Sequence, residues 1–136
     1  MKYMLDTDTL IYFLRQKPPS VSDRLNALAE DDSIGMSFVT WAELLKGAEG
    51  SVRRAEVLKR LSVLARSIPV MYPARSDICS HYARHASRLK AEGRPIGGND
   101  LWIASHALAE GATLVTSNVG EFTRIRGLAV ENWAVA

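Results

Sequence analysis

Short apolar runs, separated by longer stretches of mixed polarity, set the pattern of this chain. The first run, residues 3–6, ends at an acid, and such a short, continuously apolar run is typical of a buried parallel strand. Further strands are predicted at residues 33–37, 68–71, 113–116 and 128–131. Pro69 cannot donate a ladder hydrogen bond, so the strand over 68–71 is expected at an edge of the sheet.

The stretches between these runs carry apolar residues at helical spacing. Val57, Leu61 and Leu64, for example, fall on one face of a helix. Helices are predicted at residues 7–16, 20–30, 40–49, 53–67, 75–92 and 99–110.

Proline, serine and glycine mark several of the predicted helix ends. The proline pair at 18–19 cannot continue the first helix. Ser20 or Ser22 is the expected N-cap of the second helix, and Gly111 is expected to close the helix over 99–110.

The alternation of strands and helices defines the expected fold class. It predicts an α/β protein of three layers, with a mostly parallel sheet of four to five strands and helices on both faces. At 136 residues the chain suffices for one core and is short for two, so residues 1–136 are expected to form a single domain. In such folds, ligands bind beyond the carboxyl ends of the strands, near the point where the strand order reverses.

Composition narrows the class of protein without fixing its function. Hydrophobic residues make up 47% and charged residues 24% of the chain, as in ordinary globular proteins, and no apolar run approaches the roughly 20 residues that span a bilayer. An acid follows the first five residues, too early for a signal-peptide core, so a cytoplasmic location is expected. Cys79, the single cysteine, excludes an intrachain disulfide and is expected to be a small, at least half-buried hydrophobe.

Acidic or amide residues stand at four junctions that are far apart in the chain. They are Asp6, Glu43, Asp100 and the pair Asn118 and Glu121. Because each lies at the end of a predicted strand or the start of a predicted helix, folding is expected to bring them to one edge of the sheet. Crowded carboxylates repel each other unless a cation lies among them, and Mg²⁺ and Mn²⁺ prefer oxygen ligands. The pattern therefore predicts metal-dependent phosphate chemistry, with nucleic acid as the expected substrate.

Each acid also has a structural explanation. Asp6 is a suitable N-cap for the helix that follows it. Thr40 and Glu43 have the spacing of a capping box, in which Glu43 would bind the amide of Thr40. Asp100 would complement a helix dipole, and Asn118 with Glu121 repeats the capping spacing. Residues that only cap helices, however, need not lie at one edge of a sheet, whereas the ligands of a metal ion must.

The same positions carry a resemblance to a known family. The run from Met4 to Asp8, the segment 39–47 with Glu43, the segment Asn99-Asp100 with Ile103 and Ala104, and the segment 116–122 resemble the PIN-domain ribonucleases, and more narrowly the VapC-type toxins of bacterial toxin–antitoxin pairs. The resemblance covers nearly the whole chain. It implies a PIN fold, RNA cleavage that depends on Mg²⁺ or Mn²⁺, a tRNA substrate such as initiator tRNA, and inhibition by a small VapB-type antitoxin.

The resemblance also implies roles for individual residues. Asp6, Glu43 and Asp100 match the metal-binding and catalytic acids of the family. Many relatives carry Asp where this chain has Asn118, so Asn118 and Glu121 are both candidate ligands there. Either Glu121 supplies the missing charge, or a second metal is bound only weakly.

In the expected mechanism, Asp6, Asp100 and one further acid hold an ion that activates water, and Glu43 is a general base or binds through water. Asp8 is expected to add an outer contact to the ion.

Weaker expectations concern contacts with RNA. The hydroxyls of Thr116 and Ser117 could position water or phosphate, and Arg94 and Lys46 could contact the RNA backbone. Lys46 could equally pair with Glu43 on its own helix. His81 and His85 lie one helical turn apart, but the sequence near them offers no third metal ligand.

Two alternatives to the nuclease remain open. The run from Leu5 to Thr9 resembles the DxDxT motif of haloacid-dehalogenase-type phosphatases, with Asp6 as nucleophile and Asp8 as general acid. Those enzymes need a downstream Lys and a further acidic pair, and the twenty residues after Thr116 contain neither Lys nor Asp. The other alternative is a degenerate PIN domain that binds without cutting, which only Asn118 supports.

Partners are expected on the resemblance and on apolar surface. The helix pair over residues 40–67 could dock an amphipathic antitoxin helix, or bury its apolar stripe in the protein's own core. A homodimer is expected, with the apolar tail over residues 133–136 as a possible contributor.

Overall fold

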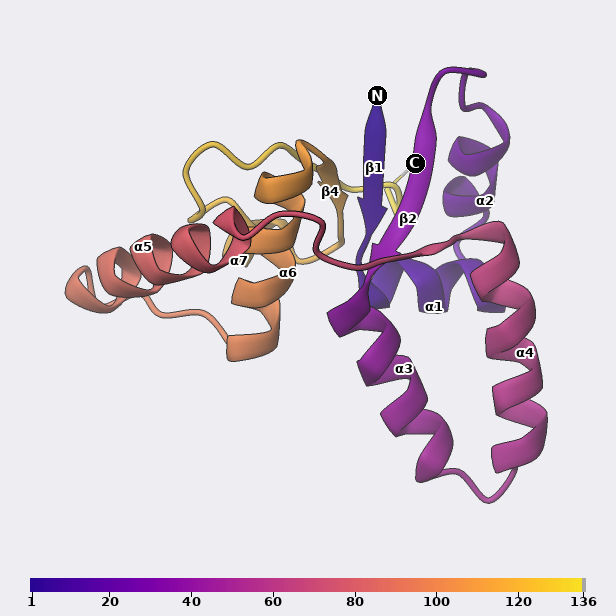
Figure 1. Cartoon of the computed structure of the whole chain (residues 1–136). Helices are drawn as coiled ribbons and strands as arrows, with labels where there is room; N and C mark the ends of the chain where they lie inside the picture. The colour runs from indigo at the N-terminus through magenta and orange to yellow at the C-terminus, as the bar shows by residue number, and fades with distance from the viewer. Residues whose placement is uncertain (136) are drawn as a thin grey trace.

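A five-stranded sheet runs through the middle of the molecule, and all of its neighbouring strands are parallel. The computed structural model describes residues 1–135 and places the strands in the order β3-β2-β1-β4-β5. Figure 1 labels β2, β1 and β4 of this sheet. The strands are β1 (Lys2–Leu5), β2 (Ser33–Ser37), β3 (Val70–Met71), β4 (Thr113–Val115) and β5 (Val130–Glu131). The proline-flanked strand β3 is an edge strand, as predicted.

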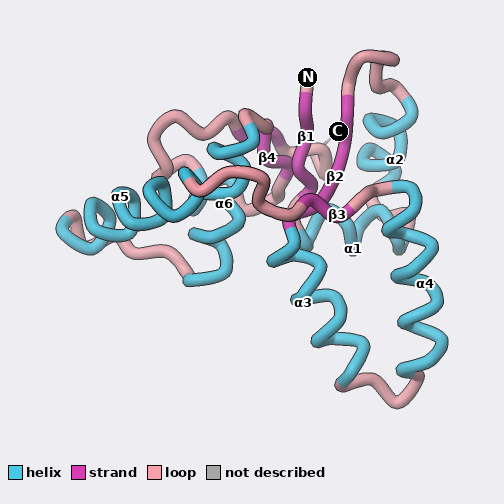
Figure 2. Tube along the Cα trace, in the orientation of Figure 1, coloured by secondary structure: helices cyan, strands magenta, loops and turns pink. Residues whose placement is uncertain are grey.

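Helices cover both faces of this sheet, so the predicted three layers are confirmed. Figure 2 shows the strands between one group of helices, α1 to α4, and another, α5 to α7. The helices are α1 (Thr7–Arg15), α2 (Pro19–Asn26), α3 (Phe38–Glu49), α4 (Arg54–Ser67), α5 (Asp77–Ala91), α6 (Gly98–Glu110) and α7 (Val119–Phe122). Within residues 1–135, no helix is long and apolar enough to cross a membrane.

Alternating side chains of the strands divide the core in two. In β1, Tyr3 and Leu5 pack with Leu61 and other residues of α1 to α4, whereas Met4 packs with residues of α5 to α7 such as Ile103. Successive residues of a strand point to opposite faces, so a strand that is buried on both faces is apolar at every position. This double burial is the reason that the first strand was visible as a continuous apolar run.

The strand order reverses between β1 and β4, and this determines where a ligand site is expected. From β1 the chain adds β2 and then β3 on one side, and later adds β4 and β5 on the other. The carboxyl ends of β1 and β4 therefore flank the crevice in which parallel α/β sheets bind ligands. Asp6 follows β1 directly, and Thr116 follows β4.

Most predicted elements are confirmed within a few residues, and the differences have local causes. The second helix begins at Pro19, not after a serine N-cap, because proline suits the first turn, and it ends at Asn26 instead of residue 30. The short helix α7 was not predicted, since four residues are too few for a periodic pattern. Gly111 closes α6 in the left-handed conformation, as expected.

One prediction about burial was wrong, and one residue of the expected dimer contact is buried. Cys79 is exposed, because it lies on the outer face of α5 while its neighbour Ile78 is buried. Trp133 is part of the core, in edge-to-face contact with Tyr3 at a centroid distance of 5.2 Å, so its ring is not available for a dimer contact. Ala136, the end of the proposed tail, lies outside the described residues.

Candidate active site

Asp6 joins the end of β1 to the start of α1. Its backbone amide donates to the carbonyl of Val115 at 2.8 Å, which ties the junction to the neighbouring strand β4. Its Oδ1 accepts from the amide of Thr7 at 2.8 Å, so Asp6 is indeed the N-cap of α1. Capping uses only one carboxylate oxygen, and the side chain is only 6% exposed. A buried carboxylate is costly, so a helix cap alone does not explain its position.

The end of β4 supplies hydroxyl groups that fix this carboxylate. Thr116 donates its hydroxyl to Oδ2 of Asp6 at 2.9 Å and accepts from the amide of Asn118 at 3.1 Å. Thr116 is fully buried, so its hydroxyl orients Asp6. Ser117 donates its amide, at 3.1 Å, and its hydroxyl to Oδ2 of Asp8. The two strand ends are thus joined through two acids.

Glu43 reaches the same edge from α3. The capping box that could have explained Glu43 structurally does not form: Ser37 is the N-cap of α3 and accepts from the amide of Val39, whereas Thr40 is already inside the helix. Glu43 instead accepts the hydroxyl of Thr7 at 2.9 Å. The interaction joins α3 to the first residue of α1. The contact of Thr7 was not predicted, since nothing in its spacing indicates a partner 36 residues away.

Asp100 and Glu121 approach from the other group of helices. Asp100 lies in the first turn of α6, where the helix dipole favours an acid. Glu121 accepts from the side-chain amide of Asn118 at 2.7 Å and from the amide of Gly97 at 3.3 Å. The segment before α6 is thereby held against α7, and Asn118 and Glu121 form a pair, not a helix cap.

The pKa values show that these acids act on one another. Burial raises the pKa of Asp6 from 3.8 to about 6, and the charges of Asp8 and Glu43 add to the effect. Burial likewise raises the pKa of Asp100 from 3.8 to about 7, followed by the charges of Asp6 and Glu121 and, more weakly, of Glu43. Side chains from four separate junctions therefore share one electrostatic environment.

The donor set fits a hard divalent cation. Its atoms are carboxylate and amide oxygens, and in the described part of the chain Asp6, Glu43, Asp100 and Glu121 make no ion pair with Lys, Arg or His. A buried acid without a cationic partner is the environment that a bound ion would stabilise. Over residues 1–135, however, no three acidic, His or Cys side chains form a closed set of ligands as they stand.

The remaining candidates lie around this edge. Lys46 is exposed one turn beyond Glu43 on α3, and it makes no ion pair with Glu43. Arg94 is exposed in the segment between α5 and α6 that leads to Asp100. Both remain predictions as RNA contacts.

Comparison with known proteins identifies the class of this fold. Residues 3–128 match the PIN domain family, which is nearly the whole chain. The chain therefore belongs to the PIN-domain family. The match supports the nuclease interpretation of the run from Leu5 to Thr9 and gives no support to the phosphatase alternative.

Individual relatives narrow the assignment. The chain is 45% identical over 133 residues to Ribonuclease VapC1 of Haemophilus influenzae strain R2866, covering 98% of each protein. It is 36% identical over 138 residues to a protein of Shigella flexneri named tRNA(fMet)-specific endonuclease VapC, covering 98% of this chain and 99% of that one. These relatives place the chain in the VapC group of the PIN-domain family.

Solved structures agree with this placement. The chain superposes on VapBC-1 from nontypeable Haemophilus influenzae with a TM-score of 0.94 and 44% identity, covering 99% of this chain and all of that one. It superposes on VapBC2 from Rickettsia felis, bound to a DNA fragment from its promoter, with a TM-score of 0.90 and 36% identity, covering 98% and 99%.

Proposed function

We propose that this protein is a metal-dependent endoribonuclease toxin of the VapC type that works as a single PIN domain. The observation that carries the proposal is the convergence of Asp6, Glu43, Asp100 and Glu121 at the strand-order reversal without a cationic partner. VapC relatives named as ribonucleases support RNA as the substrate class. We propose that the protein acts in the cytoplasm, where tRNA is found.

Asp6, Asp100 and the pair Asn118 and Glu121 are the proposed ligands of Mg²⁺ or Mn²⁺. A bound ion of this kind would supply acidification of water and neutralisation of charge on the phosphodiester. The hydroxyl of Thr116 and the amide of Thr7 hold Asp6 in place. Raised pKa values make the ion-free acids partly protonated near neutrality, so cation binding releases protons as the carboxylates ionise.

Glu43 is the proposed general base. Its carboxylate accepts a proton from water that attacks the phosphorus, or orients that water through a hydrogen bond. The hydroxyl of Thr7 holds one carboxylate oxygen, Oε1, which leaves Oε2 for this role. Ser117 fixes Asp8 beside the same edge, where its negative charge would favour a bound cation.

We propose a tRNA as the substrate, with initiator tRNA as the first candidate. The relative from Shigella flexneri is named for tRNA(fMet), and it aligns over 98% of this chain. Arg94 and Lys46, which are both exposed, are the proposed contacts to the RNA backbone, and Thr116 and Ser117 are candidates for positioning phosphate.

An antitoxin is proposed to bind between α1 and α4. Two hollows of about 340 Å³ each adjoin there and share Leu14 and Arg60. Val63 and Leu14 expose 51% and 43% of their surface, so apolar area remains for a partner. The groove lies between α1 and α4, not between the two helices of residues 40–67. VapBC structures support a VapB-type partner, which would lay an amphipathic helix in this groove. We further propose a homodimer.

The test is RNA cleavage by the purified protein with Mg²⁺ or Mn²⁺ and with a chelator. We expect cleavage that a chelator abolishes and that Asp100→Asn lowers at least about 100-fold, because the ion loses a charged ligand. Asp31→Asn is the matched control, since it removes the same charge from an exposed loop. End mapping of fragments from a panel of tRNAs identifies the target.

Three outcomes would contradict parts of this proposal. RNA binding without cleavage, unaffected by Asp100→Asn, would indicate a degenerate PIN domain. Equal cleavage with and without chelator would exclude the metal-dependent mechanism. Equal cleavage of all tRNAs and of unstructured RNA would exclude the proposed substrate.

A further inference from the structure

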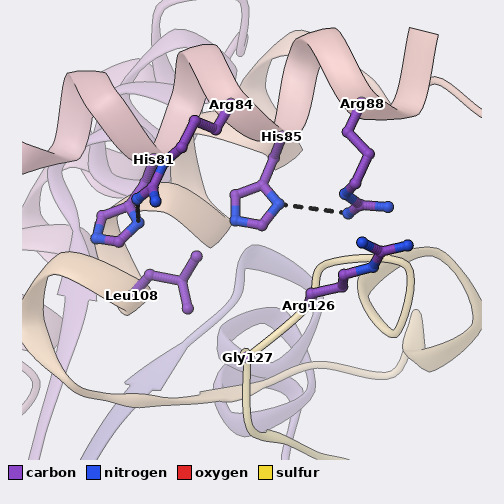
Figure 3. Close-up of a pocket in the computed structure, with 7 residues that line it drawn as sticks. All are labelled: His81, Arg84, His85, Arg88, Leu108, Arg126 and Gly127. Carbon is purple, nitrogen blue, oxygen red and sulfur yellow. Dashed lines mark hydrogen bonds between the residues drawn. The ribbon is translucent and has the colours of Figure 1, made fainter. Parts of the chain in front are cut away.

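A second concave site, lined by basic residues, lies outside the acidic edge. It is a hollow of about 410 Å³ between α5 and the segment that precedes β5 (Figure 3). We call it the basic hollow; its lining residues are His81, Arg84, His85, Arg88, Leu108, Arg126 and Gly127. None of these residues belongs to the proposed nuclease centre.

The polar groups that line the basic hollow are almost entirely hydrogen-bond donors. Arg84 contacts Nδ1 of His81 at 3.1 Å, and Arg88 contacts Nδ1 of His85 at 3.3 Å (Figure 3). A guanidinium can only donate, so each Nδ1 is the acceptor and each neutral imidazole carries its proton on Nε2. The lining therefore presents guanidinium and imidazole N–H groups around the apolar side chain of Leu108, which is a composition suited to an anion.

Positive charge around the hollow exceeds the negative charge that balances it. Arg88 and Arg126 both contact Glu92, at 3.2 and 3.5 Å, so one carboxylate serves two guanidinium groups. Arg84 makes no ion pair among the described residues. Burial lowers the pKa of His85, and the charge of Arg88 and the other cations around the hollow lowers it further. The direction of these charge effects on His85 agrees with an excess of positive charge around the hollow.

The hollow and the acidic edge lie at opposite ends of α6. Leu108 is in the last turn of that helix and Asp100 in its first turn, which separates them by about 12 Å along the axis. Gly127 precedes β5, so the hollow adjoins the amino ends of the strands, whereas Asp6 follows a carboxyl end. A single phosphate group therefore cannot contact both sites.

We propose that the basic hollow binds a backbone phosphate of the RNA substrate at a distance from the cleaved bond. The inference rests on the proposed function and deepens it, because it assigns to the protein a second RNA contact. Only an RNA long enough to reach both ends of α6 can make that contact and occupy the acidic edge at the same time. Arg84 and Arg126 are exposed and bind the phosphate oxygens, and the N–H of His85 adds a further donor. Arg88 also donates to the carbonyl of Arg124 at 2.7 Å, so it holds the wall of the hollow in place.

The test is the double variant Arg84→Gln/Arg126→Gln, assayed for cleavage of the target tRNA. We expect KM to rise about tenfold with kcat unchanged, and the salt dependence of tRNA binding to weaken by about one in log–log slope, because one phosphate contact is lost. The matched control is Arg53→Gln/Arg66→Gln, which removes two exposed charges of α4 and the loop before it. Arg84→Lys/Arg126→Lys keeps the charges and should retain most of the affinity.

The remaining outcomes separate this inference from its alternatives. Equal KM values for the double variant and the control would overturn it. It would also be overturned if the double variant lost affinity together with melting temperature and the Lys pair did not restore the affinity. If inorganic phosphate raises the melting temperature of the unmodified protein but not of the double variant, while KM for tRNA is unchanged, the hollow binds a free anion and the RNA contact is wrong. If the unmodified protein cuts no RNA, the proposed function fails, and direct tRNA binding by the same variants still decides the inference.

Discussion

Replacing Asp6 with Asn is expected to stabilise the ion-free protein at neutral pH. The carboxylate is buried, and burial raises its pKa from 3.8 to about 6. As the pH rises, the unfolded chain therefore loses this proton before the folded protein does, and the free energy of unfolding falls between about pH 4 and pH 6. Above that range the loss is complete. Asn keeps the shape of the side chain and an oxygen that accepts from the amide of Thr7.

The magnitude follows from the two pKa values. A folded-state pKa of about 6 against 3.8 lowers the free energy of unfolding by about 3 kcal/mol well above pH 6. Part of this is already present at pH 4, because the unfolded carboxyl is half ionised near 3.8. The pH-dependent part between about pH 4 and about pH 7.5 is roughly 2 kcal/mol. Asn carries no ionisable group, so the variant should lack it.

Urea unfolding in chelator, at about pH 4 and about pH 7.5, measures this difference. Subtracting the unmodified protein from Asp6→Asn at each pH cancels the titrating groups that do not interact with Asp6. Loss of the Asp6 charge also lowers the pKa of Asp100, which acts in the same direction, so the variant should gain roughly 2 kcal/mol or more relative to the unmodified protein between the two pH values. Asp31→Asn, in an exposed loop, should gain little. If the difference between Asp6→Asn and the unmodified protein is the same at both pH values, the argument from burial is refuted.

Three further predictions concern other contacts. Thr7→Val removes the hydroxyl that holds Glu43 and should lower kcat about tenfold with little change in KM, whereas Thr7→Ser should restore it; normal kcat in the Val variant would remove this positioning role. Burial lowers the pKa of His106 below its ordinary value of 6.5, so its imidazole should be less than half charged at pH 6.5 in an NMR titration, and a half-charged ring at that pH would contradict this reasoning. Leu14→Glu places a charge in the groove between α1 and α4 and should abolish co-purification with a VapB-type antitoxin while RNA cleavage persists; retained co-purification would place the partner elsewhere.

Local sequence was sufficient to predict most strands and helices, and to predict that the acids at their ends lie near one edge of the sheet. Strands such as β1 and β4 are buried on both faces, which makes each a continuous apolar run, and parallel strands bring their carboxyl ends to one edge. For this reason Asp6 and the residues after β4 could be placed together from the sequence. The mutual influence of Asp100, Asp6 and Glu43 on their pKa values agrees with that placement.

Contacts between side chains from distant segments could not be predicted. Glu43 has a capping spacing with Thr40, and only the packing of α3 against α1 gives it Thr7 as a partner. The basic hollow is equally invisible, because Arg126 is separated from α5 by more than thirty residues. The burial of Trp133 depends on Tyr3 at the other end of the chain.

The position of β1 determines when, during synthesis of the chain, the proposed nuclease site can form. The first strand, β1, is at the centre of the sheet. The acid that follows it, Asp6, is held by the hydroxyl of Thr116, which lies 110 positions later in the chain. While the chain is being synthesised, β1 can pair with β2 but not with β4, because β4 belongs to the last fifth of the polypeptide. A growing VapC-type chain therefore carries no finished cutting edge, and the cell that makes it is exposed only after translation of the message is almost complete.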